Sequence, residues 1–265
     1  MDLSNDSKNL PIPLRSSLRR SQIKNELKQI FNAAYPIQKE NKEPKREMED
    51  IFSFIKMTKS SFHQKRLKRI LSALLHERDY LSRPIKVLDF SCREGITSRA
   101  IAGLGFPTVG LDSNREKIKQ ASELKKRLPT LTPLHFIHSD LANAPYWERK
   151  VEIQLEGLPD VIVMENTLKN LHSIDQFLNR LFHWMKSGSF LLINEENPWA
   201  LGFQIQRHLN KNKQREWNRT YGGWKTALEK SHFRLSPAAG IDLIPGIDYF
   251  LPQICSSLLF TAQKL

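Results

Sequence analysis

Residues 85–95 read Ile-Lys-Val-Leu-Asp-Phe-Ser-Cys-Arg-Glu-Gly, a short apolar stretch that ends in an acid and then turns. A strand of this length and composition is typical of a parallel sheet whose two faces are both covered. Residues 95–105 follow with apolar side chains at helical spacing. A strand, a turn and a helix in this order predict the first unit of a doubly wound α/β domain.

The alternation continues along the chain. Further strands are expected at residues 108–112, 134–138, 159–164, 189–193, 232–236 and 256–262. Helices are expected at 113–128 with Ser113 as N-cap, at 174–185, at 199–209 and at 221–230. Short apolar strands that alternate with helices predict a mostly parallel sheet with helices on both faces.

Two segments of different character precede this domain. Residues 1–45 are polar, basic and interrupted by four prolines, which predicts a mostly disordered basic arm. Residues 46–84 carry apolar side chains three and four positions apart, which predicts a helical extension that packs on the core. The α/β domain is assigned to 85–265, with 198–221 as a lid or substrate insert that mixes aromatic and basic side chains.

Composition excludes several classes of protein. The chain has 265 residues, of which 40% are hydrophobic, too many for a wholly disordered chain. Its apolar runs are too short to span a bilayer, and its polar, acidic start does not resemble a signal peptide, so we expect a cytoplasmic protein with no membrane span. Two cysteines, Cys92 and Cys255, provide neither a disulfide framework nor a zinc cluster.

The net charge of +13 is concentrated towards the N-terminus, where residues 1–80 hold 17 basic and 10 acidic side chains. Such a region either contacts a nucleic acid or is a solvated tail and helix face. The interleaved acids favour the solvated reading.

Ligands of an open parallel sheet bind beyond the carboxyl ends of its strands. Acids follow several of the expected strands, and Asp112 lies 23 residues after Asp89. An acid at that spacing suits a ribose diol, since one carboxylate can accept both hydroxyl protons. A single acid of this kind is more often a helix N-cap, but the series favours a binding site.

These residues carry a resemblance. Val87–Gly95 resembles the first motif of the class I S-adenosylmethionine-dependent methyltransferases, and Val109–Asp112 resembles their second strand with its ribose-binding acid. The stretches 139–140, 163–171, 182–193 and 224–233 resemble later motifs of the family in the right order. The resemblance implies a Rossmann-like, seven-stranded doubly wound sheet with a C-terminal antiparallel hairpin, in addition to the N-terminal helices.

The resemblance also implies the cofactor S-adenosyl-L-methionine. Asp89 is expected at its amino-acid end, Asp112 at the ribose, Asp140 and Leu141 beside the adenine, and Glu165 near the methyl group. The full set of expected cofactor-binding residues is Asp89, Ser91, Cys92, Gly95, Asp112, Ser113, Asp140, Leu141, Glu165 and Asn166.

Two positions depart from the family pattern. The family has glycines where this chain has Ser91 and Arg93, and Gly95 alone is retained. A positive φ at Arg93 would cost about 1–2 kcal/mol, whereas a negative φ would let its side chain point away or pair with an acid. The departure keeps open a non-catalytic, methyltransferase-like binding module.

No catalytic residue is assigned. His172 is the most natural general base, although a surface histidine is the favoured reading. Lys169 and Asn170 stand where some small-molecule relatives carry a metal-holding Glu-His pair, so no metal is expected. We therefore expect methyl transfer to a small molecule. The alternatives are an RNA- or protein-directed enzyme that uses the basic arm, with nucleic acid as its partner, and the binding module. The sequence assigns no oligomeric state.

Overall fold

The computed structural model describes residues 66–67, 69–75, 85–126, 133–140, 144–168, 171, 173–197, 221–236, 239–241 and 257–264. The chain divides into two compact units, residues 1–80 and 81–265. In the first unit the described residues between 66 and 75 are helical, and Ile70, Leu71, Leu74 and Leu75 are buried. The arm predicted at 1–45 and most of the insert at 198–221 lie outside the described residues.

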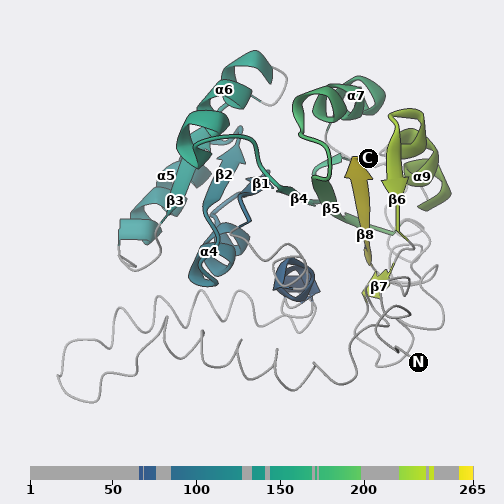
Figure 1. The fold of residues 1–265 in the computed structure, drawn as a ribbon. Coiled ribbons are helices and arrows are strands. Elements are labelled where there is room, and N and C mark those ends of the chain that lie inside the picture. The colour runs from purple at the N-terminus through teal and green to yellow at the C-terminus, as the bar shows by residue number, and fades with distance from the viewer. Residues whose placement is uncertain are drawn as a thin grey trace, which may run out of the picture. The chain divides into compact units, whose positions relative to one another are not determined.

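The second unit is built on one mixed sheet (Figure 1). Its strands are β1 (Val87–Phe90), β2 (Thr108–Asp112), β3 (Leu134–His138), β4 (Val161–Glu165), β5 (Phe190–Glu196), β6 (Phe233–Leu235), β7 (Ala239–Ile241) and β8 (Ser257–Lys264). They pair in the order β3-β2-β1-β4-β5-β8-β6, and the short β7 pairs with β8 beside this path. The first five strands are parallel, whereas β8 runs antiparallel to β5, β6 and β7. The predicted seven-stranded doubly wound sheet with a C-terminal antiparallel pair is confirmed, with β7 as an additional strand that the sequence did not indicate.

Helices cover both faces of the sheet. They are α4 (Ile96–Gly103), α5 (Arg115–Lys126), α6 (Ala144–Leu155), α7 (Ile174–Trp184) and α9 (Tyr221–Lys230). Side chains of α6, α7 and α9 share one buried hydrophobic cluster with the central strands. Figure 1 shows α6 and α7 above the sheet and α9 beside β6. On the other face, Ala102 of α4 packs with Leu134 and Phe136 of β3.

Helix α6 was not predicted. Trp147, Val151 and Leu155 are four residues apart and fully or almost fully buried, so they form its core-facing stripe. The Trp147 ring packs edge-on against Phe90 at 5.2 Å and against Trp184 at 5.1 Å between ring centroids. The helix therefore fixes β1 and α7 around one aromatic cluster, which keeps the strand that leads into the predicted binding turn in place.

The start of α5 differs from the prediction of Ser113 as N-cap. The helix begins at Arg115, and the Asn114 side chain accepts a hydrogen bond from the Lys117 N–H at 3.1 Å. Asn114 therefore caps the helix, one residue later than predicted, and Ser113 remains exposed.

The amino ends of the strands carry an ion pair in which the acid is buried. Asp160, which precedes β4, is 2% exposed and lies 2.5 Å from the Lys186 ammonium. Its other carboxylate oxygen accepts the Lys86 N–H at 2.8 Å. These contacts link the starts of β1, β4 and β5 at the edge opposite the carboxyl ends.

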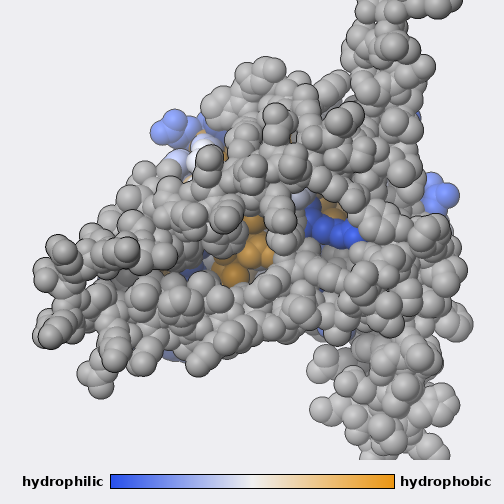
Figure 2. Space-filling model, turned by 90° about the horizontal axis from the view of Figure 1, so that it is seen from below, coloured by the Kyte–Doolittle hydropathy of each residue, from blue (hydrophilic) through white to orange (hydrophobic). Residues whose placement is uncertain are grey.

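Viewed from below, the described residues show a hydrophobic area at the centre of the surface with hydrophilic side chains beside it (Figure 2). Tyr146 and Ile153, both on α6, are the large hydrophobic side chains most exposed to solvent among the described residues. Within that part of the chain, no helix has the length and hydropathy needed to cross a membrane.

Candidate active site

The carboxyl ends of β1, β2 and β4 lie side by side at one edge of the sheet. Phe90 of β1 is in register with Leu111 of β2 and with Met164 of β4. The residue that follows in each neighbouring strand is Asp112 or Glu165. The topology therefore gathers at one edge the acids that the sequence placed at separate strand ends.

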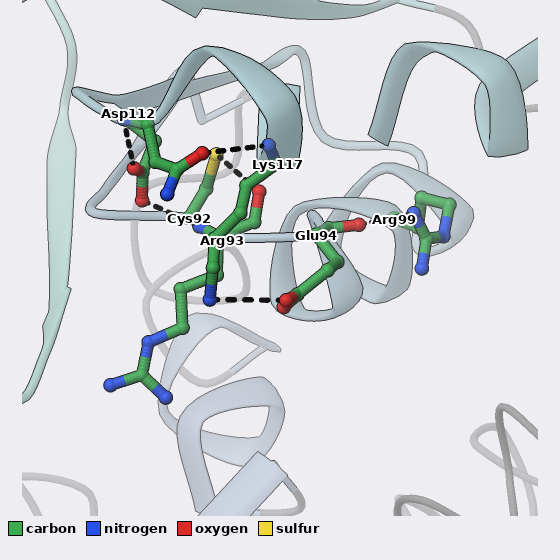
Figure 3. Close-up of polar contacts among 7 residues, drawn as sticks. Cys92, Arg93, Glu94, Arg99, Asp112 and Lys117 are labelled. Carbon is green, nitrogen blue, oxygen red and sulfur yellow. Dashed lines mark hydrogen bonds and ion pairs between the residues drawn. The ribbon is translucent and has the colours of Figure 1, made fainter. Parts of the chain in front are cut away.

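The turn between β1 and α4 keeps a left-handed backbone at all three positions where the family has glycine. Ser91 has φ +64°, Arg93 has φ +53° and Gly95 has φ +71°. Of the two alternatives left open for Arg93, the structure therefore has the positive φ, and the strain expected for a positive φ applies. Arg93 is exposed, and Figure 3 shows its guanidinium pointing away from Asp112.

Asp112 joins this turn to the end of β2. One carboxylate oxygen accepts the Arg93 N–H at 2.8 Å, and the other accepts the Asn114 N–H at 2.8 Å (Figure 3). The side chain is only 7% exposed. Because each carboxylate oxygen has two lone pairs, these bonds leave one acceptor position on each oxygen. These two acceptor positions fit two adjacent ribose hydroxyls, which would donate to them.

Asp89 is the most deeply buried acid of the site. It is 2% exposed, and the Ser98 hydroxyl of α4 donates to its Oδ2 at 2.5 Å. The pKa of this carboxyl is raised to about 7, mainly by burial and to a smaller extent by the charges of Glu165 and Asp112, against the opposing effect of the Ser98 bond. Asp89 therefore titrates near neutral pH.

Glu165 at the end of β4 is held from α4. The Thr97 hydroxyl donates to Glu165 Oε1 at 2.8 Å, and the carboxylate is partly accessible. Thr97 and Ser98 are adjacent in the first turn of α4, so this one turn holds the two acids of the two neighbouring strands. The sequence analysis missed both residues. Their position on the first helical turn after the binding loop is the signal that would have indicated them.

Gly95 has a packing role besides its left-handed φ. A Cβ on Gly95 would lie 2.5 Å from Cε1 and Cζ of Phe136, too close for any side chain. A Cβ on Gly110 would lie 2.7 Å from the same ring and 2.8 Å from Ser98 Oγ. Phe136, which the sequence analysis did not select, therefore fixes how closely the turn, α4 and β2 approach.

The remaining predicted residues take separate positions. Cys92 is buried, and burial raises the pKa of its thiol, so it remains neutral and packs within the turn. Asp140 is exposed, and the preceding Ser139 N–H donates to the Asp112 carbonyl at 3.1 Å, so this segment lies beside Asp112. Asn166 is buried with φ +51°, and its N–H donates to the Asn194 carbonyl at 2.8 Å.

Leu141, Lys169, Asn170 and His172 lie outside the side chains that the structure describes. Over the described part of the chain, no group of three or more His, Cys, Asp or Glu side chains is arranged to hold a metal ion.

Comparison with known proteins identifies the family of the chain. A family model described as a methyltransferase domain matches residues 60–240, well over half of the chain. No curated protein matches its sequence.

Solved structures match the fold at low sequence identity. Magnesium protoporphyrin IX methyltransferase from Synechocystis PCC 6803, solved with bound SAH, is 14% identical with a TM-score of 0.60, over 93% of this chain and 98% of that one. The methyltransferase domain of bacterial CtHen1-CN is 16% identical with a TM-score of 0.58, over 77% and 100%. A SAM-dependent methyltransferase from Aquifex aeolicus is 15% identical with a TM-score of 0.55, over 80% and 98%.

The fold, the strand-end acids and the family match define a class I S-adenosylmethionine-dependent methyltransferase. The chain belongs to the methyltransferase domain family, and the predicted enzyme class is confirmed. S-adenosylmethionine as the cofactor follows from that membership.

Proposed function

We propose that the chain transfers the methyl group of S-adenosylmethionine to a small-molecule acceptor, with the cofactor held at the carboxyl ends of β1, β2 and β4. The observation that carries this proposal is the Asp112 carboxylate, buried and anchored by two backbone N–H groups with an acceptor position left on each oxygen. A fixed carboxylate with two open hydrogen-bond acceptor positions suits the two adjacent hydroxyls of a ribose.

When bound, the cofactor supplies an electrophilic methyl carbon on a positively charged sulfur. The acceptor's lone pair forms the new bond to that carbon as the carbon–sulfur bond breaks, so the protein's task is in-line placement of the two reactants. Well-oriented reactants in one complex react as if one of them were present at an effective molarity of roughly 10⁵ M or more, so correct placement alone accounts for a large rate increase. Asp112 would fix the ribose and the 91–95 turn would receive the amino-acid end. Glu165, held by Thr97, would border the space where donor and acceptor meet.

Two observations support a small acceptor. The solved structure that matches 93% of this chain is a methyltransferase whose name states a small-molecule substrate, magnesium protoporphyrin IX. The stretch at the end of β4, Glu165-Asn166-Thr167-Leu168, is not the Asn-Pro-Pro-Tyr type of motif expected of an enzyme that methylates the amino group of adenine in DNA. The alternative acceptor is an RNA or a protein bound through the basic residues 1–45.

The test is calorimetric titration of the full chain with S-adenosylmethionine, compared with the Asp112→Asn variant. The asparagine NH₂ group cannot accept a hydrogen bond, so one of the two ribose hydroxyls would lose its bond to a charged acceptor. A bond of that kind is worth about 1.5–3 kcal/mol, so we expect affinity to fall by roughly 10- to 150-fold. Glu123→Gln, which removes an exposed carboxylate on α5, is the matched control and should bind normally.

Unchanged affinity in Asp112→Asn would refute the placement of the ribose. No binding by the parent chain at millimolar cofactor would refute the enzyme and favour the binding module. A nucleic-acid shift assay with and without residues 1–45 tests the alternative acceptor, because phosphate contacts must weaken as salt rises.

A further inference from the structure

The site concentrates negative charge where a positively charged ligand is expected. Asp89, Asp112 and Glu165 come from three adjacent strands and end at the same edge of the sheet. Asp89 is fully buried, Asp112 is nearly so and Glu165 is partly exposed. Three carboxylates this close repel one another, and the repulsion acts most strongly on the one that water reaches least.

The hydrogen bonds show which of the three acids is best suited to carry a proton. Asp112 accepts two backbone N–H groups, and Glu165 accepts the Thr97 hydroxyl while remaining partly hydrated. Asp89 has the Ser98 hydroxyl at 2.5 Å, a group that can donate to a carboxylate or accept from a carboxylic acid. The groups that act on Asp89 are Glu165 of β4, Asp112 of β2 and Ser98 of α4; Cys92 of the turn stays neutral. Of the three acids, Asp89 is therefore the one that most favours the protonated, neutral form.

We infer that Asp89 is partly protonated in the unliganded site and releases its proton when the positively charged donor binds, so that the site favours the sulfonium donor over the uncharged thioether product. The inference rests on the proposed function, since it places the donor at this edge of the sheet. The donor brings one positive charge more than the product. Ionisation of Asp89 to solvent balances that charge, and after methyl transfer the carboxyl can take a proton back as the product leaves.

The sign of the pH dependence follows from these states. Asp89 has a pKa of about 7 without ligand, and a cation beside it lowers that pKa. Below pH 7 the donor must expel the proton in order to bind, so its apparent affinity rises as pH increases through 7. The slope is at most one proton, or about tenfold in affinity per pH unit. Binding of the uncharged product should show a flatter dependence.

The experiment is titration of the full chain at pH 7 in phosphate and in Tris, whose ionisation enthalpies differ strongly. With a free pKa near the working pH, about half of the molecules hold the proton, so the donor should release about 0.5 proton and S-adenosylhomocysteine clearly less. Equal heats for the donor in the two buffers, or equal proton release by the two ligands, would overturn the inference. Absence of donor binding would overturn the proposed function as well, so the two failures are distinguishable.

Variants with opposite expected effects make the assignment specific to Asp89. Asp89→Asn should abolish the released proton. Ser98→Ala removes a hydrogen bond that favours the ionised acid, so proton release should persist to higher pH. Glu165→Gln removes a neighbouring negative charge, so the pH window should move lower. Glu123→Gln should leave the proton count at the parent value. If Asp89→Asn does not fold, the opposed shifts of the Ser98 and Glu165 variants decide the matter, and shifts of the same sign would refute the assignment.

Discussion

Gly95→Ala is the substitution whose cost the structure defines best. Gly95 has φ +71°, and the added methyl group would stand 2.5 Å from two ring atoms of Phe136. The left-handed backbone costs a non-glycine residue about 1–2 kcal/mol. Overpacking against the partly buried Phe136 ring costs a further 1–3 kcal/mol or so. We therefore expect Gly95→Ala to lower the free energy of unfolding by about 2–5 kcal/mol.

Gly105→Ala is the matched control. Gly105 lies just beyond the same helix with φ +84°, but a Cβ there meets no atom within 4 Å. Both substitutions reduce the freedom of the unfolded chain equally, so that contribution cancels in the comparison. Gly105→Ala should lose only the backbone part, about 1–2 kcal/mol. The difference between the two variants, about 1–3 kcal/mol, isolates the contact with Phe136.

Urea unfolding of both variants with constant m-values measures that difference. Adding Phe136→Leu to Gly95→Ala shortens the obstructing side chain, so the double variant should recover part of the overpacking cost but none of the backbone cost. Equal destabilisation by Gly95→Ala and Gly105→Ala would show that the turn relaxes around the methyl group, and the argument from Phe136 would then be refuted.

Two further predictions concern stability. Arg93→Gly should stabilise the chain by about 0.5–1 kcal/mol, because it removes the strain of a left-handed non-glycine residue at some cost in unfolded-state entropy. Arg93→Ala should bring no gain, because alanine is strained in the same backbone conformation. Equal unfolding midpoints for the glycine and alanine variants would contradict this. Lys186→Met leaves the buried Asp160 carboxylate without its ammonium partner and should cost about 1–3 kcal/mol, less than a fully buried pair because Lys186 is 37% exposed. Lys126→Met is the control, at the exposed ion pair with Glu123, and should lower the free energy of unfolding by well under 1 kcal/mol in the same denaturation assay. A similar loss of stability in both variants would show that the burial of Asp160 does not explain the effect of Lys186→Met.

The strands could be predicted from the sequence because burial on both faces leaves continuous apolar runs. β5 shows the limit, since it extends to Glu196, beyond the apolar run that ends at Ile193. Glu195 is nevertheless buried, where it accepts the Leu168 N–H at 2.8 Å. A buried acid looks like a loop residue in a sequence, because the partner that makes it tolerable lies 27 positions away.

The missed elements have different explanations. Helix α6 carries its signal in Trp147, Val151 and Leu155, but the polar residues between them and the Pro145 at its start weaken the pattern. β7 has only three residues and is defined by its pairing with β8, so no local pattern could indicate it.

The candidate site shows the same division. Asp89, Asp112 and Glu165 could be selected because a parallel sheet brings its strand ends together whatever the details of packing. Thr97 and Ser98 are indicated in the sequence only by their place on the first turn of α4, and which acid each one binds depends on the folded structure. Phe136 could not be selected, because its importance lies in contacts with residues distant in sequence. The Thr97–Glu165 bond joins residues 68 positions apart, and Phe136 is recognised only by how little space it leaves beside Gly95.

The unusual turn at residues 91–95 and Asp112, the acid proposed to hold the ribose, depend on each other. With φ +53° at Arg93, the turn directs the N–H of that residue to Asp112, where the hydrogen bond measures 2.8 Å. A bond from a backbone N–H to a carboxylate contributes about 1.5–3 kcal/mol, the same order as the cost of about 1–2 kcal/mol for a left-handed arginine. The carboxylate thus offsets the strain that the missing glycine introduces. Loss of Asp112 should therefore loosen the turn as well as remove the proposed ribose contact. Arg93→Gly should partly restore cofactor binding to Asp112→Asn, because the turn would no longer need the bond to hold its shape.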